Sequence, residues 1–126
     1  MDLKISELMQ MQHALHKLHE ADWSPLEPEY GKNTVLYMIE EIGEVIAILK
    51  KKGARAVVES PDVRAAFLEE MADTLMYYTD TLLRYHVTAD ELSDAYARKF
   101  QRNMGRNYTQ EYKELYNNGQ DYDRLL

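Results

Sequence analysis

Two short acidic runs carry side chains whose types and spacing suit metal chemistry. The first reads Glu-Glu-Ile-Gly-Glu and the second Glu-Glu-Met-Ala-Asp. Residues three or four apart on a helix are neighbours, so Glu41 lies beside Glu44, and Glu70 lies beside Asp73. If two such helices pack side by side, their four carboxylates repel one another unless a cation neutralises them. Magnesium fits this role because it is a hard divalent ion that prefers oxygen ligands.

The same spacing also fits two helix faces that simply point into water. The acidic residues of the first run lie opposite the apolar stripe of their helix, as solvated residues do. However, Tyr37 and Ile48 share that acidic sector. The wide apolar arc of the other helix also leaves Glu70 and Asp73 near its edge. Spacing alone therefore leaves both interpretations open.

The elements that must position these residues are all predicted to be helices. The apolar periodicity favours an all-α fold, an antiparallel four-helix bundle. The predicted helices cover residues 3–20, 33–52, 61–86 and 88–104, with a short fifth helix over residues 109–116. Residues 21–32 contain two prolines and a glycine and are predicted as a loop, and residues 54–60 as a connector. No segment alternates with period two, so no sheet is expected.

Local signals predict where these helices begin. Asn33 is predicted to cap the second helix, and the third begins at residue 61 or 62. Thr88 and Glu91 have the spacing of a capping box for the fourth helix.

The third predicted helix has the broadest apolar surface. Its apolar residues are Phe67, Leu68, Met71, Ala72, Leu75, Tyr78, Leu82 and Leu83. They cover about half of its circumference, so we expect it to be the most buried element. A chain of this size is not expected to cover such an arc alone, which predicts a homodimer or homotetramer.

Composition narrows the classes of protein. The 126 residues suit one domain, residues 1–126, and the absence of cysteine excludes disulfides and thiolate metal sites. A net charge of −7 argues against nucleic acid as a partner. No apolar run reaches membrane-spanning length, so we expect a cytoplasmic protein without a membrane partner.

The acidic runs and a later basic element occur in an order that resembles a known enzyme family. In chain order the motifs are Glu40-Glu41-x-x-Glu44, Glu70-x-x-Asp73 and Lys99-x-x-x-Asn103-x-x-Arg106. Together they resemble the motifs of the MazG-like nucleoside triphosphate pyrophosphohydrolases, whose superfamily includes the dimeric all-α dUTPases. The resemblance covers roughly residues 10–108. The three motifs on separate helices are more specific than any one of them.

The resemblance implies a role for each motif residue. It implies that magnesium, or manganese, is held by Glu41, Glu44, Glu70 and Asp73. It implies that Glu40 acts on the attacking water, and that the phosphates or sugar are contacted by Lys99, Asn103 and Arg106. Related enzymes place an aromatic residue near the position of Trp23 to stack on the base, although core or hinge packing would explain this residue equally well.

The implied reaction is magnesium-dependent hydrolysis of a (deoxy)nucleoside triphosphate to the monophosphate and pyrophosphate, as in nucleotide-pool control. The alternative is a non-catalytic helical adaptor or nucleotide-sensing module that keeps the fold. A di-metal oxidoreductase bundle expects Glu-x-x-His pairs, which the third helix lacks because its motif ends in Asp73.

Other polar residues are assigned to the surface. His13, His16 and His19 recur every third position, but each step drifts by about 60° around a helix, so a solvated face is favoured over a metal site. Asp80 lies two turns beyond Asp73 on the same face and is also predicted to be a surface residue.

Overall fold

The computed structural model describes residues 1–117, and these residues form helices and no strand. The helices are α1 (Ile5–Leu18), the 3₁₀ turn η1 (Pro28–Tyr30), α2 (Gly31–Lys52), α3 (Ala54–Glu59), α4 (Pro61–Arg84), α5 (Ala89–Met104) and α6 (Tyr108–Asn117). The all-α prediction is therefore confirmed for the described part of the chain. The chain divides into two compact units, residues 1–91 and a second unit that starts at Leu92.

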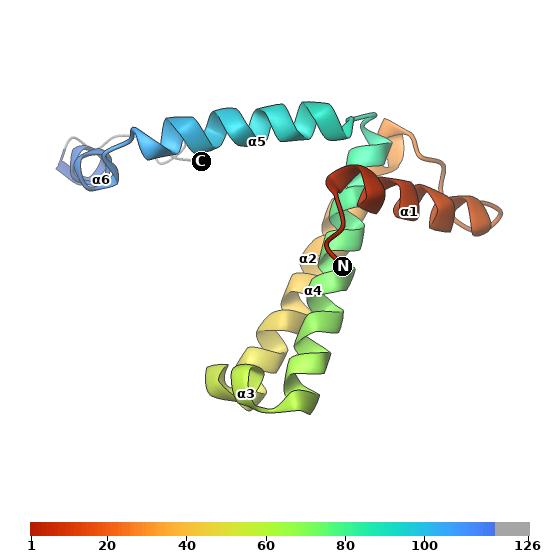
Figure 1. Ribbon diagram of the computed structural model, residues 1–126, viewed down its shortest axis with the longest axis horizontal. Helices are drawn as coiled ribbons and strands as arrows, with labels where there is room; N and C mark the ends of the chain where they lie inside the picture. Colours follow the sequence, from red (N-terminus) through yellow and green to blue (C-terminus); the bar gives the residue numbers. More distant parts are fainter. Residues whose placement is uncertain (118–126) are drawn as a thin grey trace. The chain divides into compact units, whose positions relative to one another are not determined.

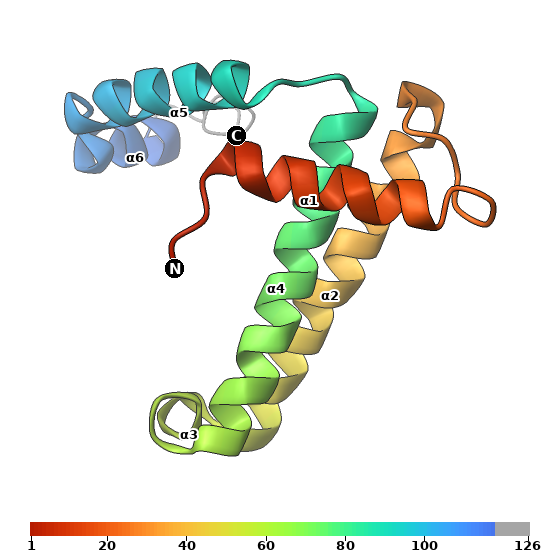
Figure 2. The same ribbon diagram turned by 45° about the vertical axis from the view of Figure 1, so that its right-hand side comes forward.

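The first unit is built around a pair of antiparallel helices, α2 and α4 (Figures 1 and 2). The short helix α3 joins them at one end. The helix α1 crosses the pair near its other end, where it packs against α4. This arrangement brings the two acidic runs, one on each long helix, onto neighbouring elements.

The start of α2 differs from the prediction. Asn33 does not cap this helix, because the helix already begins at Gly31, directly after η1. A side chain at Gly31 would overlap the ring of Tyr85. The close approach of these two residues is a tertiary contact, so the local sequence pattern gave no sign of it.

Two further boundaries are corrected. Residues 54–60 are not an open connector, because six of them form α3, which follows Gly53 at a φ of 83°. The helix α4 begins at Pro61 as predicted, but it ends at Arg84 because His86 takes a left-handed φ of 57°. The capping box before α5 is confirmed, since the backbone N–H of Glu91 donates to the Thr88 hydroxyl at 3.1 Å. The N–H of Thr88 in turn donates to the Glu91 carboxylate at 3.0 Å.

Part of the apolar arc of α4 is uncovered in the single chain. Its residues Leu68, Met71, Leu75 and Tyr78 are 40–54% exposed. Its buried residues are instead polar, namely Thr79, Asp80 and Arg84. The helix packs on α2, α1 and α3, and part of the apolar arc predicted from the sequence is left uncovered.

The second unit contains most of α5 and, as far as the structure describes it, α6. The predicted fifth helix over residues 109–116 is confirmed and extends one residue further at each end. At the junction of the two helices Arg106 pairs with Glu111 at 3.0 Å, and its guanidinium lies 4.5 Å from the centre of the Tyr108 ring. Among the described residues, the helices are either too short or too polar to cross a membrane.

Candidate functional site

Three carboxylates from two helices converge on one point of the first unit. Glu41 comes from α2, and Glu70 and Asp73 come from neighbouring positions of α4. One oxygen of each lies within 4.8 Å of the others, and all three residues are partly buried. The predicted pairing of Glu70 with Asp73 on one helix face is thus confirmed, and so is the meeting of that face with the acidic run of α2.

The crowding of negative charge has an electrostatic consequence at Glu70. Hydrogen bonding with the Glu41 carboxyl raises the pKa of Glu70 above its ordinary value of 4.5. Partial burial and the charges of Glu41, Asp73 and Glu44 act in the same direction. A proton or a cation is therefore stabilised at this point.

The two remaining acidic residues of the α2 motif stand apart from the three. Glu44 is exposed and is outside the close cluster, although its charge reaches Glu70. Glu40 is exposed as well. Of the four predicted metal ligands, the structure therefore brings three together and leaves Glu44 at the margin.

A cavity of about 590 Å³ opens beside this cluster within the first unit. Glu41 and Asp73 line it, so the acidic cluster forms part of its wall. The remaining wall includes the aromatic residues Trp23, Tyr30, Tyr37 and Tyr77 and the charged pair Asp80 and Arg84. A cavity of this volume accommodates a small organic ligand.

Four aromatic rings form part of the wall of the cavity. Trp23 is 40% exposed and stacks on His19, with 4.7 Å between the ring centres. Tyr37 of α2 and Tyr77 of α4 lie 5.9 Å apart. Burial raises the pKa of the Tyr77 phenol above 10.0, and nearby Glu41 and Asp73 add to this shift. Tyr77 is therefore a neutral phenol near neutral pH and offers a hydrogen bond donor.

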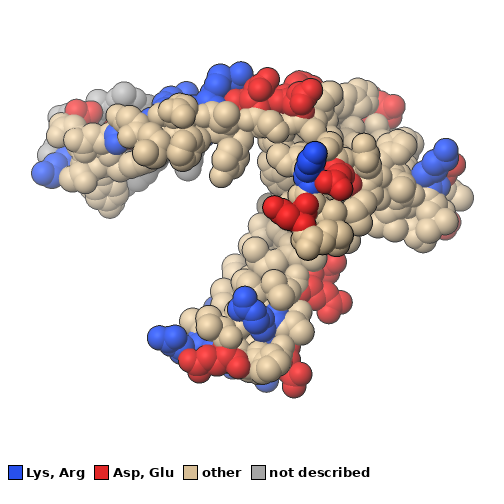
Figure 3. Space-filling view, viewed as in Figure 1, with Lys and Arg blue, Asp and Glu red and all other residues tan. Residues whose placement is uncertain are grey.

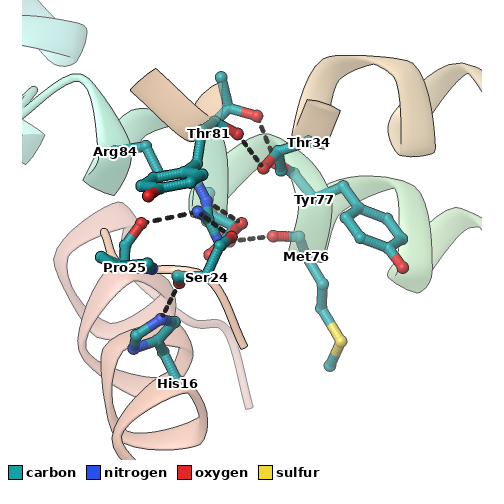
Figure 4. A network of polar contacts seen from close by, with 11 residues as sticks. His16, Ser24, Pro25, Thr34, Met76, Tyr77, Thr81 and Arg84 are labelled. Carbon is teal, nitrogen blue, oxygen red and sulfur yellow. Dashed lines mark hydrogen bonds and ion pairs between the residues drawn. The ribbon is translucent and has the colours of Figure 1, made fainter. Parts of the chain in front are cut away.

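A buried polar network joins α4 to the loop after α1 (Figure 4). Arg84 donates from Nε to Asp80 at 2.8 Å and from Nη1 to the Ser24 hydroxyl and the Pro25 carbonyl oxygen, each at 2.8 Å. The His16 ring bonds to the Ser24 carbonyl oxygen at 2.7 Å. These contacts fix the segment that carries Trp23 over the cavity.

The network corrects two predictions. His16 does not lie on a solvated face, because only 7% of it is exposed and its ring is bonded to the loop. Asp80 is not a surface residue, because only 6% of it is exposed. The spacing of Asp80 and Arg84, four residues apart on one helix, was the available sign of an ion pair.

The basic motif lies in the second unit of the chain, which we describe separately from the first. Lys99 is exposed. Arg106 donates to the Asn103 side-chain oxygen at 3.3 Å, so these two motif residues do meet. The guanidinium of Arg106 is also bound to both oxygens of Glu111. The predicted phosphate contact of this motif stays a prediction.

Comparisons with protein-family models, with curated proteins and with solved structures gave no match for this chain or its fold.

Proposed function

We propose that this protein is a magnesium-dependent nucleoside triphosphate pyrophosphohydrolase of the MazG-like kind, acting in the cytoplasm. The observation that carries the proposal is the convergence of Glu41, Glu70 and Asp73, from two helices, on the wall of a cavity lined with aromatic rings. The proposed reaction is taken from the MazG-like enzymes, which the order of the three motifs resembles. The cavity supplies a place for a nucleoside next to the acidic cluster.

The chemistry of the acidic cluster fits magnesium. Three carboxylates offer the hard oxygen ligands that this ion prefers. The pKa of Glu70 is raised first by its hydrogen bond with Glu41 and then by burial, and the nearby negative charges that add to this shift are ones that a cation would neutralise. Glu41, Glu70 and Asp73 hold the ion in this proposal, and Glu44 joins them from the adjacent turn of α2. Bound magnesium, or manganese, neutralises charge on the phosphates and makes a coordinated water more acidic.

The remaining residues act on the substrate. Glu40, which precedes Glu41 in the chain, orients or deprotonates the attacking water. Lys99, Asn103 and Arg106 hold the phosphates, because guanidinium and ammonium groups suit a polyanion in an otherwise acidic protein. Trp23 presents its ring to the base. The phenol of Tyr77, kept neutral by its surroundings, donates a hydrogen bond into the cavity.

We also propose that the protein works as a homo-oligomer. Ile39, Ile42, Ile46 and Leu49 of α2 recur at the spacing of a helix-packing stripe and are 40–57% exposed. The exposed residues Leu68, Met71, Leu75 and Tyr78 repeat this spacing on α4. Two such stripes on an antiparallel helix pair suit a second copy of the same pair, which would complete a four-helix bundle. In the view of Figure 3, charged side chains gather at the α3 end of the pair, and a group of acidic side chains lies at the right-hand edge of its middle, next to an uncharged surface.

The decisive experiment measures pyrophosphate release across a panel of canonical and damaged (d)NTPs, with magnesium and with EDTA. We expect release of pyrophosphate and the monophosphate from at least one of them, in magnesium only. Release of orthophosphate instead would indicate a different phosphohydrolase. A lack of turnover across the panel would favour a non-catalytic nucleotide-binding module.

A further inference from the structure

The buried face of α1 contains an amide side chain that no protein group binds. The buried residues of this helix are Met9, Gln12 and His16, which are three or four positions apart and share one face. Only 8% of Gln12 is exposed. The ring of His16 bonds to the loop after the helix, whereas the amide of Gln12 has no hydrogen bond partner among the described residues. A buried amide without a partner is costly, so its place on this face requires an explanation.

Both amide atoms of Gln12 remain accessible to a ligand. Among the described residues, Oδ1 of Asp80 is the one side-chain nitrogen or oxygen that is fully covered and also lacks a partner. Oε1 and Nε2 of Gln12 have no partner either, so each of them retains accessible surface. Gln12 lines the cavity together with Leu15 of the same helix. Because the rest of the side chain is covered, this accessible surface opens on the cavity.

The orientation of the Gln12 amide is not fixed by the protein. An amide presents a donor, its NH₂ group, beside an acceptor, its oxygen. A hydrogen bond to a neighbouring residue would decide which of the two faces a ligand at a given point, and Gln12 makes none with the described residues. A rotation of about 180° around the last side-chain bond therefore exchanges donor and acceptor without breaking a protein contact.

Gln12 and the acidic cluster lie on the wall of one cavity but belong to different helices. Glu41 and Asp73 come from α2 and α4, and Gln12 comes from α1. Phosphates held at the acidic cluster would leave the base of a nucleotide to reach another part of the wall. Trp23 lines the same cavity and offers a flat surface for a base. A stacking surface and an accessible amide are together sufficient to recognise a flat heterocycle by its face and its edge.

We propose that Gln12 binds the hydrogen-bonding edge of the nucleobase and, by turning its amide, accepts either polarity of that edge. This inference rests on the proposed nucleotide-binding function of the cavity. Uracil and guanine present a ring N–H beside a carbonyl oxygen, whereas cytosine and adenine present an amino group beside a ring nitrogen. An amide that can turn pairs with both arrangements through two hydrogen bonds. The site therefore takes nucleotides of both kinds and rejects those whose edge is blocked by alkylation, because the amide then stays unpaired.

The test uses the single tryptophan of the chain as a reporter. Trp23 lines the cavity, so a ligand there changes its fluorescence. The probes are UMP and CMP, which are similar in size and present opposite edges, each with a methylated derivative, N3-methyl-UMP or N4,N4-dimethyl-CMP. The dissociation constants of UMP and CMP should agree within about threefold, and each methylated derivative should bind about tenfold more weakly than its parent.

The variant Gln12→Met separates the amide from the shape of the side chain. Methionine is unbranched and fills a similar space, but it has no N–H donor and its sulfur is only a weak acceptor. Parent and methylated nucleotides should therefore bind this variant alike. Gln10→Met, the same change at an exposed position of the same helix, should keep the discrimination. If Gln12→Met still rejects the methylated nucleotides, the rejection is steric and the proposal is overturned.

The wild-type comparison stands even if Gln12→Met does not fold. Equal binding of parent and methylated nucleotides would overturn the proposal, as would discrimination for only one of the two pyrimidines or no fluorescence response to any nucleotide. These results are separate from the fate of the proposed reaction. Discrimination without pyrophosphate release would contradict the hydrolase and keep the role of Gln12. Hydrolysis without discrimination would do the reverse.

Discussion

The carboxyl groups of Glu41 and Glu70 meet across the interface of α2 and α4, and hydrogen bonding between them raises the pKa of Glu70. Below the ordinary value of 4.5 the side chain is protonated in both the folded and the unfolded chain. As the pH rises toward the raised value, the unfolded chain releases this proton first. The folded chain without metal therefore loses stability through this group over that interval.

This relationship predicts the pH dependence of Glu70→Gln. The variant cannot acquire the negative charge, so its melting temperature in EDTA should exceed that of the wild type by an amount that grows as the pH rises above 4.5. Glu69→Gln removes the same charge from an exposed neighbouring position and serves as the control. A difference between Glu70→Gln and wild type that shrinks with rising pH would contradict the repulsion at the cluster.

Magnesium should stabilise the protein. An ion that binds the folded state and relieves the repulsion among Glu41, Glu70 and Asp73 raises the melting temperature. We expect the increase to grow with the logarithm of the magnesium concentration once this exceeds the dissociation constant, and activity to vanish with EDTA and return with magnesium or manganese. Differential scanning fluorimetry and a pyrophosphate assay measure the two effects. Full hydrolysis in metal-free buffer would exclude the proposed role of the ion.

Neutral variants should separate the metal ligands from the residue that acts on water. Asp73→Asn should abolish turnover and weaken magnesium binding while leaving the apo protein at least as stable. Glu44→Gln should do the same if Glu44 completes the site from its exposed position. Glu40→Gln should retain magnesium and lose rate. Calorimetric titration with magnesium distinguishes these cases. If Asp73→Asn unfolds, this carboxylate is needed for the fold and its assignment as a metal ligand is wrong.

The basic motif requires a control for its own ion pair. Arg106→Ala and Lys99→Ala should each reduce kcat/KM by about tenfold or more, as expected for a lost charged contact, with magnesium binding unchanged. Because Arg106 is paired with Glu111, its removal also breaks a contact within the second unit. Glu111→Gln breaks that pair and keeps the guanidinium. If Glu111→Gln loses as much activity as Arg106→Ala, the arginine has a structural role.

Self-association should depend on the apolar stripes of α2 and α4. Ile46→Asp places a charge in the middle of the α2 stripe and should shift the protein to monomer, measured by sedimentation equilibrium. Val58→Asp changes an equally apolar residue that is 61% exposed on α3, outside the stripe, and should leave the assembly intact. A wild-type protein that stays monomeric at tens of micromolar would refute the proposed assembly.

The sequence was sufficient for features that depend on local pattern. The helical periodicity, the Thr88–Glu91 capping box and the neighbouring positions of Glu70 and Asp73 follow from spacing along one helix. The meeting of these carboxylates with Glu41 needed one further assumption, that the two acidic helices pack together. The contact of α2 with α4 satisfies it.

Features that depend on a distant partner were missed. The position of Asp80 along α4 fits an exposed residue as readily as a residue in the wall of a cavity. The loop that carries Ser24 and Pro25 encloses it, and that loop is distant in the sequence. His16 is buried for the same reason. The periodicity located the apolar stripe of α4 but could not identify what covers it, and the single chain leaves Leu68, Met71, Leu75 and Tyr78 40–54% exposed.

The bonds from Arg84 to Ser24 and Pro25 join residues 60 and 59 positions apart in the chain. Closing a loop of that length costs more chain entropy than forming the local turns of α2 or α4. The bonds that offset this cost can form only after both helices have formed. We therefore expect the wall over the cavity to be the last part of the first unit to order during refolding and the first to open. Pulsed hydrogen exchange on residues 19–30 and 70–80 would reveal that order, and simultaneous protection of both segments would contradict it.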